Sequence, residues 1–369
     1  MERETQMGDA IRRRSFLKSA AAVGLAAAVP KVAIAQSSLY KGSGEVRVAS
    51  LGGSFEEAQN RGVFQPFQKL SGIKVDLVAY QGPSQVAAQE KTGNIEWDCI
   101  LMSKGAMLSL LRQGYLAKID YTRIDKDELA GITPQSMIHP YGVPNILFTR
   151  GIAYNTKLID PKHHPTTWAE VWDTKTFPGQ RSLGAFSGSL TPDLEFALLA
   201  DGVAMDKLYP LDIDRAFKSL DRIRPHVAQF WTTGAISPQL LTDGEVSVAS
   251  AYLNRIGDLV GSGAPVAGEW NQGEIQNNYW CILKGAKNYD NAMKLIAYAT
   301  SAEGQAGFSR ETLMGPTNSR AFKYLTPERA KLLPSSPENL PKQFVYNDEW
   351  WADHRAEVQK RWDQWVLAK

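Results

Sequence analysis

Short apolar runs alternate with segments of helical periodicity from residue 45 onward, and this alternation leaves few folds open to the chain. The runs EVRVASL, IKVDLVAY and WDCILM are typical of strands, and the segments 55–70, 84–92 and 104–113 are typical of helices. Strands separated by helices pair in parallel, because each helix carries the chain back across one face of the sheet. This part of the sequence therefore predicts one α/β unit.

A second series of the same kind occupies the middle of the chain. Strands are expected at RSLGAFS, VAQFW, VSVAS and PVAGEW, and helices at 191–201, 212–223 and 234–242. Two extended stretches, PYGVPNILFTRGIAYN and NNYWCILKGA, lie between the two series and after the second. We therefore expect two Rossmann-like α/β lobes, joined by strands that cross between them near Arg150–Asn155 and Asn277–Leu283.

The C-terminal segment 348–367 is predicted to be a helix. Trp351, Val358, Trp362 and Trp365 follow one another at spacings of seven, four and three, which places them on one helix face. A helix docked on the body of the protein explains this stripe, and a platform of tryptophans for a ligand is the alternative.

The N-terminus carries the features of a twin-arginine export signal over residues 1–35. Arg13 and Arg14 precede the run SFLK, an Ala-rich apolar stretch follows, and the run AIA ends the segment as a cleavage site of small residues. The Ala-rich stretch is too short and too weakly apolar for a membrane span. A basic amphipathic N-terminus, the alternative, would not explain the cleavage site. We therefore expect cleavage after Ala35 and a mature chain in the periplasm.

The charge of the mature chain argues against polyanionic partners. The full sequence has 41 Lys and Arg against 39 Asp and Glu, and removal of residues 1–35 leaves 35 basic and 36 acidic residues. No basic run remains, so we expect neither nucleic acid nor an anionic membrane surface as a partner. A periplasmic protein also meets little ATP or NAD, so we expect no nucleotide cofactor.

Residue types that bind metals or catalyse reactions form no recognisable motif. The five histidines show neither H-E-x-x-H nor a Cys/His ligand spacing, so we expect no metal site. An enzyme is the main rival function, but the chain has no G-x-S-x-G and neither cysteine adjoins a histidine motif. Cys99 and Cys281 lie in apolar runs, where buried free thiols are the preferred interpretation and a disulfide is the alternative.

Three predicted loops follow strands at the edge of a sheet where α/β proteins bind ligands. The first strand stops before Gly53, and a helix begins with Ser54, so unpaired N–H groups can meet an anion or a polar ligand. Ser103 and Lys104 follow WDCILM, and the loop FSGSLTP holds the same position in the second lobe, where Thr191 is expected to cap the next helix. The glycine spacing matches no nucleotide motif, so we expect a polar solute.

Seven sequence motifs follow one another along the chain: GGS, GIAYNTKLID, PTTWAEVWD, GAFSGSLTPDLEFALL, LTDGEVSVASAYLNR, EWNQG and MGPTN. Through these motifs the chain resembles the extracytoplasmic solute-binding proteins of ABC importers, in the spermidine/putrescine-binding-like family. The resemblance extends from about residue 45 to the C-terminus. The resemblance implies a type II periplasmic-binding fold that closes on a small-molecule solute, no catalysis, and a membrane permease as partner. We expect a monomer, with one lobe from 45–149 and 281–322 and the other from 150–280 and 323–369. Two membrane partners for the closed, solute-bound form remain open from the sequence: the permease of an importer and a chemoreceptor.

The charge of the predicted cleft bears on the solute. Polyamine binders of this family place an Asp-x-x-Glu pair where this chain has the run SGSL, and an Asp where it has Asn278. Polyamines need carboxylates around their ammonium groups. Because these acids are missing and Lys104, Arg150 and Arg255 lie in predicted cleft segments, we expect a carboxylate- or phosphonate-bearing amino compound. Arg255 is its expected bidentate partner.

The alternative solute is a polyamine such as spermidine or putrescine, held by acids such as Glu56, Glu57 or Glu269. The candidate ligand-binding residues are Gly53, Ser54, Ser103, Lys104, Ser187, Ser189, Trp231, Tyr252, Arg255, Asn278 and Tyr279.

The export signal can be tested through its arginine pair. Replacing Arg13 and Arg14 by Lys should leave the precursor in the cytoplasm, because the twin-arginine route reads the pair itself rather than its charge. Cell fractionation followed by immunoblotting measures this. Undiminished mature protein in the periplasm would show that another route is sufficient.

Overall fold

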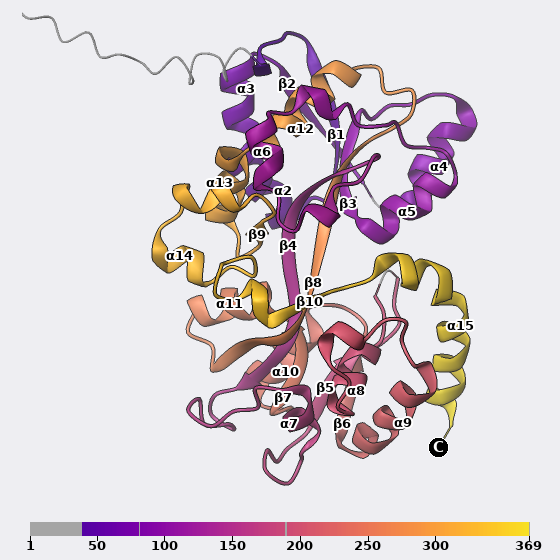
Figure 1. The fold of residues 1–369 in the computed structure, drawn as a ribbon, viewed down its shortest axis with the longest axis vertical. Helices are drawn as coiled ribbons and strands as arrows, with labels where there is room; N and C mark the ends of the chain where they lie inside the picture. Colours follow the sequence, from indigo (N-terminus) through magenta and orange to yellow (C-terminus); the bar gives the residue numbers. More distant parts are fainter. Residues whose placement is uncertain (1–38, 81, 189, 369) are drawn as a thin grey trace, which may run out of the picture.

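The computed structural model describes residues 39–80, 82–188 and 190–368, so the predicted export signal lies outside the described residues. Figure 1 shows two α/β lobes, one above the other, with two long strands running between them. We call the lobe around β1, β2 and β3 the upper lobe and the lobe around β5, β6 and β7 the lower lobe. The two-lobed α/β architecture predicted from the sequence is confirmed.

The upper lobe is built from the first predicted series. Its strands are β1 (Glu45–Ser50), β2 (Lys74–Ala79) and β3 (Cys99–Ser103), and β1 pairs in parallel with both of the others. Its helices are α2 (Gly53–Gln59), α3 (Gln65–Ser71), α4 (Pro83–Thr92), α5 (Lys104–Arg112), α6 (Lys126–Gly131), α12 (Tyr289–Thr300) and α13 (Ala302–Glu311).

The lower lobe is built from the second series. Its strands are β5 (Arg181–Gly184), β6 (Val227–Trp231) and β7 (Val248–Tyr252), and β5 pairs in parallel with both neighbours. Its helices are α7 (Trp168–Trp172), α8 (Leu194–Ala200), α9 (Ile213–Ile223), α10 (Ile236–Asp243) and α11 (Leu253–Gly261). The rest of the chain adds β9 (Gly315–Pro316), α14 (Pro327–Lys331), β10 (Gln343–Val345) and α15 (Asp348–Leu367).

Two long strands, β4 (Val143–Asn155) and β8 (Val266–Ile282), belong to both lobes. They pair antiparallel along almost their whole length; the end of β8 also pairs with β3, and the end of β4 pairs with β7. The strands therefore form one hydrogen-bonded path, in the order β2-β1-β3-β8-β4-β7-β5-β6. The predicted crossing segment Arg150–Asn155 falls on β4, and Asn277–Leu283 falls on β8 except for Leu283, which follows its end. The residue ranges assigned to each lobe stay a prediction.

The helix predicted over 55–70 is interrupted by one wider turn. A π-helical turn at Asn60–Phe64 separates α2 from α3, and Gly62 in this turn lies directly against α13. A Cβ atom on Gly62 would lie 2.6 Å from the backbone oxygen of Gly307. The wider turn and the two glycines therefore let the two helical backbones touch.

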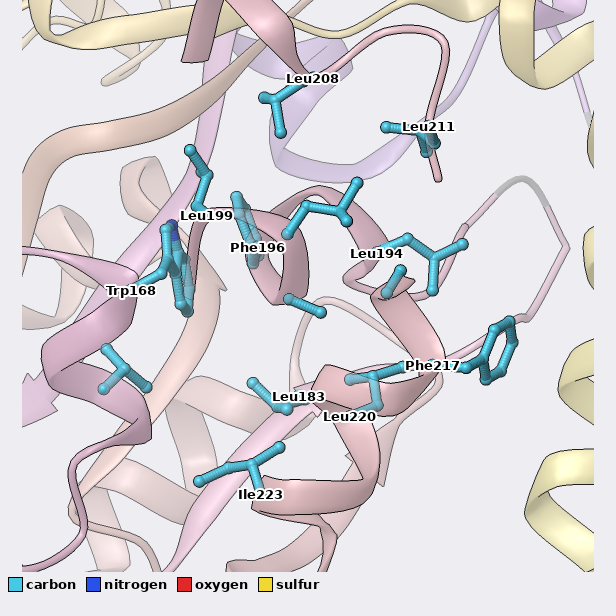
Figure 2. Close-up of a cluster of buried hydrophobic side chains, with 14 of the residues drawn as sticks. Trp168, Leu183, Leu194, Phe196, Leu199, Leu208, Leu211, Phe217, Leu220 and Ile223 are labelled. Carbon is cyan, nitrogen blue, oxygen red and sulfur yellow. The ribbon is translucent and has the colours of Figure 1, made fainter. Parts of the chain in front are cut away.

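A large apolar cluster fills the lower lobe (Figure 2). The rings of Trp168 and Phe196 stack with their centroids 3.9 Å apart, and α9 adds Phe217, Leu220 and Ile223. The three residues of α9 follow at spacings of three, which gives the helix one buried face.

The predicted C-terminal helix is α15, and it docks on this cluster. Val358, Trp362 and Trp365 are buried, and both tryptophans pack edge-on against Phe230. The docked-helix interpretation is confirmed for these residues. Among the described residues, no helix combines the length and the apolar character that a bilayer crossing requires.

The two cysteines are buried free thiols, as preferred from the sequence. They lie on adjacent strands, but Cys99 pairs with Ile282 and Cys281 pairs with Ile100. Cross-strand partners point to the same face of a sheet and neighbours along a strand to opposite faces. The two sulfur atoms therefore lie on opposite faces, and a disulfide between them would need a different register.

The contact at Gly62 can be tested by a pair of alanine substitutions. Gly62→Ala should lower the free energy of unfolding by about 1–3 kcal/mol, because the new methyl group would overlap the backbone of α13. Gly261→Ala should instead raise it by up to about 1 kcal/mol, because that helical position is open and alanine favours a helix. Urea unfolding of the mature chain measures both. Equal effects would contradict a close contact at Gly62.

Candidate functional site

A cleft with a volume of about 1010 Å³ lies between the two lobes. Its walls come from both lobes, from the two crossing strands and from α15. The lining residues are Leu51, Tyr80, Gly82, Leu101, Met102, Ser103, Gly105, Ala106, Ser109, Arg112, Gln113, Arg150, Gly188, Leu190, Thr191, Tyr252, Gln276, Asn278, Tyr346, Asp348, Trp351, Ala352 and Arg355.

The upper-lobe wall follows from the direction of the parallel strands. β1 and β3 both end at the cleft, so Leu51 after β1 and Ser103 at the end of β3 line it. The Ser103 hydroxyl caps α5 by accepting a hydrogen bond from the Ala106 N–H at 3.3 Å. Asn278 is the register partner of Ser103 on β8 and lines the cleft beside it.

A buried ion cluster stands where the strands cross. Arg150 on β4 forms ion pairs with Glu274 Oε2 at 2.7 Å and Asp193 Oδ1 at 3.1 Å, and these side chains are at most 1% exposed. Its Nη1 also donates to the carbonyl oxygen of Thr191 at 2.9 Å. Arg150 is the one member of this cluster that lines the cleft. The two carboxylates therefore orient the guanidinium from behind.

The loop before α8 differs from its prediction. Thr191 does not cap the helix, because α8 begins at Leu194 and the Thr191 hydroxyl forms a hydrogen bond with the Tyr346 hydroxyl. Asp193 caps nothing through its side chain either, since its carboxylate accepts hydrogen bonds from the Gly184 N–H and the Ser250 hydroxyl. The loop is held by the ion cluster rather than by a helix cap.

Glu195 lies next to this cluster, with no exposed surface. Its carboxylate accepts hydrogen bonds from the Tyr209 hydroxyl at 2.5 Å and from Trp351 Nε1 at 2.7 Å. Burial, and then the nearby charge of Glu274, raise the pKa of Glu195 to about 7. Glu195 therefore ties α8 to α15 and carries a proton over part of the physiological pH range.

One face of α15 lines the cleft, whereas a docked helix was the preferred prediction and a ligand platform of tryptophans was the alternative. Asp348, Trp351, Ala352 and Arg355 lie at positions i, i+3, i+4 and i+7 and all line the cleft. Trp351 belongs to this face and also to the buried apolar cluster of the lower lobe. The signal in the sequence that could have predicted this face is the pair of opposite charges, Asp348 and Arg355, two helical turns apart on the same side as Trp351.

Two ion pairs connect α15 to α5 of the upper lobe. Lys104 Nζ lies 2.7 Å from Glu349 Oε1, and Arg112 Nη2 lies 2.5 Å from Asp353 Oδ1. The N-terminal half of α15 therefore contacts both lobes beside the cleft.

The structure brings three of the predicted ligand-binding residues to the lining of the cleft: Ser103, Tyr252 and Asn278. Lys104 lies next to the lining, but its amino group is paired with Glu349. Ser187 lies next to Gly188, which lines the cleft. Ser189 is outside the described residues.

The other predicted residues lie elsewhere. Trp231 is fully buried and donates to Ser250, with its ring against Tyr252. The Tyr279 hydroxyl donates to the carbonyl oxygen of Met137, so this side chain points into the upper lobe. Gly53, Ser54 and Arg255 are exposed and outside the lining.

The acids considered for a polyamine, Glu56, Glu57 and Glu269, also lie outside the lining. Glu57 is paired with Arg61, and Glu269 with His164. The acids that sequence reasoning missed are Asp193, Glu274 and Asp348. In the described part of the chain, no three His, Cys, Asp or Glu side chains are grouped so that they could hold a metal ion.

The raised pKa of Glu195 predicts a stability that falls with pH. The folded chain holds this proton up to about pH 7, whereas the unfolded chain releases it near the ordinary value of 4.5. The free energy of unfolding of the wild type, minus that of Glu195→Gln, should therefore fall by roughly 2–3 kcal/mol between these pH values. Urea unfolding at a series of pH values measures it. A constant difference would contradict a protonated Glu195.

Comparison with known proteins agrees with this geometry. A model of the family "Bacterial extracellular solute-binding protein" matches residues 62–332. A gamma-aminobutyric acid-binding protein of Pseudomonas aeruginosa is 31% identical over 331 residues, which are 88% of this chain and 91% of that protein. A spermidine/putrescine-binding periplasmic protein of Escherichia coli is 26% identical over 311 residues, covering 79% of this chain and 83% of that protein.

Among solved structures, an ABC transporter substrate-binding protein from Bradyrhizobium japonicum is 36% identical. It superposes with a TM-score of 0.80, over 88% of this chain and 100% of that chain. The chain therefore belongs to the family of bacterial extracellular solute-binding proteins, the solute-binding components of ABC importers.

Proposed function

We propose that this protein captures a small amino acid whose ammonium and carboxylate groups are well separated, such as γ-aminobutyrate, and delivers it to the membrane permease of an ABC importer. The protein acts as a monomer in the periplasm, after export by the twin-arginine route. The likeness to a γ-aminobutyrate-binding protein supports this solute class. The observation that carries the proposal is the set of charges that line the cleft.

Three guanidinium groups and one carboxylate line the cleft among the described residues. The guanidinium groups belong to Arg112, Arg150 and Arg355, and the carboxylate belongs to Asp348. Arg112 also pairs with Asp353, and Arg150 pairs with Glu274 and Asp193. A guanidinium binds a carboxylate through two parallel hydrogen bonds, and a carboxylate binds an ammonium group. A solute with one group of each kind finds a partner for both, whereas a polyamine would bring two or more ammonium groups to a single acid.

The remaining acids near the cleft do not change this balance. Glu274 and Asp193 already form ion pairs with Arg150 and do not line the cleft. Displacing Arg150 from them would leave a buried charge without a partner, which costs about 3–5 kcal/mol. A polyamine is the second candidate, because one relative binds spermidine and putrescine and because these acids lie so near.

The cleft is much larger than the proposed solute, which supports a mechanism in which the two lobes close around the solute. About 1010 Å³ is at the upper end for a small-molecule site and far larger than a four-carbon amino acid. We therefore propose that the lobes close further around the solute. A ligand shifts the balance between open and closed forms only by its difference in affinity for the two.

Four ligands that differ by one group test the solute class. γ-Aminobutyrate should bind the mature protein, because both of its charges find partners. Butyrate lacks the ammonium group, butylamine lacks the carboxylate, and putrescine replaces the carboxylate by a second ammonium group. Each should bind at least roughly tenfold more weakly, as expected for losing a charge-assisted hydrogen bond worth about 1.5–3 kcal/mol. Calorimetry measures the affinities, and putrescine binding more tightly than γ-aminobutyrate would overturn the proposal.

Two arginine variants serve as test and matched control in the same titrations. Arg355→Ala should weaken γ-aminobutyrate binding by roughly tenfold or more, because Arg355 lines the cleft. Arg255→Ala should change the affinity by less than about threefold, because Arg255 is exposed and outside the lining. If Arg255→Ala weakens binding and Arg355→Ala does not, then Arg255 binds the carboxylate of the solute, as expected from the sequence.

A further inference from the structure

We infer that the start of α15 forms the subsite for the ammonium group of the solute, with Asp348 as its counter-ion and the rings of Tyr346 and Trp351 as its walls. This inference rests on the proposed function and assigns one end of the solute to named residues.

The subsite is built by the first turn of α15. The Asn347 side chain accepts a hydrogen bond from the Trp350 N–H at 3.0 Å and so caps the helix, which fixes Asp348 at its first position. The rings of Tyr346 and Trp351 stack with an interplanar angle of 14° and their centroids 6.1 Å apart. Asp348 and both rings line the cleft, so one carboxylate and two aromatic groups meet the solute together.

Asp348 forms no ion pair among the described residues, although the charge of Lys104 acts to lower its pKa. The nearby amino group of Lys104 is paired with Glu349 instead, and the contact that Asp348 receives from the upper lobe is a hydrogen bond from the Gly105 N–H. Burial raises the pKa of Asp348 to about 7, in agreement with a carboxylate that has lost water and gained little positive charge in exchange. An ammonium group placed here would supply that charge, and the aromatic rings would add cation–π attraction.

The same helix face carries a group of opposite charge two turns farther on. Arg355 lies seven residues after Asp348 and two turns along α15, which is a rise of about 10 Å. Its guanidinium donates to the carbonyl oxygens of Gly188 and Leu190, so it is held at the lower-lobe loop of the cleft. Opposite charges two turns apart fit an amino acid with a spacer between its charged groups better than an α-amino acid.

Asp348→Asn tests the subsite, because it keeps the size of the side chain and removes its charge. Affinity for γ-aminobutyrate should fall at least tenfold, and affinity for butyrate should stay within threefold, since butyrate has no ammonium group to lose a partner. Asp348→Glu should recover part of the loss. Asp363→Asn, an exposed aspartate farther along α15, is the matched control and should leave both affinities unchanged.

Calorimetry on the mature protein separates the possible results, and the midpoint of thermal unfolding without ligand shows that each variant is folded. Equal affinity of Asp348→Asn and the wild type for γ-aminobutyrate would overturn the subsite and leave the proposed function standing. If the wild type binds putrescine instead, the proposed function fails, and the same comparison with putrescine decides whether Asp348 holds an ammonium group. If it binds none of these ligands, both proposals fail.

Discussion

The antiparallel ladder between β4 and β8 is the part on which the rest of the structure depends. Every described strand of either lobe joins this ladder directly or through one or two other strands. Arg150 and Glu274 are register partners on these strands, beside a shift in the register, and their side chains form a buried ion pair. Because one partner without the other would leave an uncompensated buried charge, the pair holds the two strands in one register where they cross between the lobes.

The same arginine organises the cleft. Asp193 draws the loop before α8 toward Arg150, and Glu195, two residues later, reaches across to Trp351 on α15. The acids of this group outnumber its one base, and burial raises the pKa values of Glu195 and Glu274. The result is an arrangement in which carboxylates stand behind the wall of the cleft and a cation forms part of its surface.

The fold was predictable because its signals are local. Each strand–helix alternation depends on neighbouring residues, and so does the apolar stripe of α15. The sequence predicted this helix at its observed bounds, Asp348–Leu367. The break at Gly62 was not predictable, because it depends on Gly307, which lies 245 residues later. The loops after β3 and before α8 were expected at the cleft because parallel strands end there, and Ser103 and Thr191 line it.

The charges of the site were harder to predict, because they depend on which elements meet across the cleft. Arg255 and Arg355 look alike in the sequence, as single arginines on helices. Only the docking of α15 beside α5 places Arg355, and Asp348 with it, at the lining. Lys104 was expected to meet the solute, yet its charge is taken by Glu349, a residue 245 positions away.

The contact between α5 and α15 limits how the lobes can turn. Two bodies that touch at one place can rotate about any axis through it, whereas two bodies joined at two separate places keep a single axis, the line through both. The crossing strands are one such place, and the pairs Lys104–Glu349 and Arg112–Asp353 are the other. While both hold, rotation about the line through these two places is the relative motion of the lobes that breaks neither, and we expect closure to follow it.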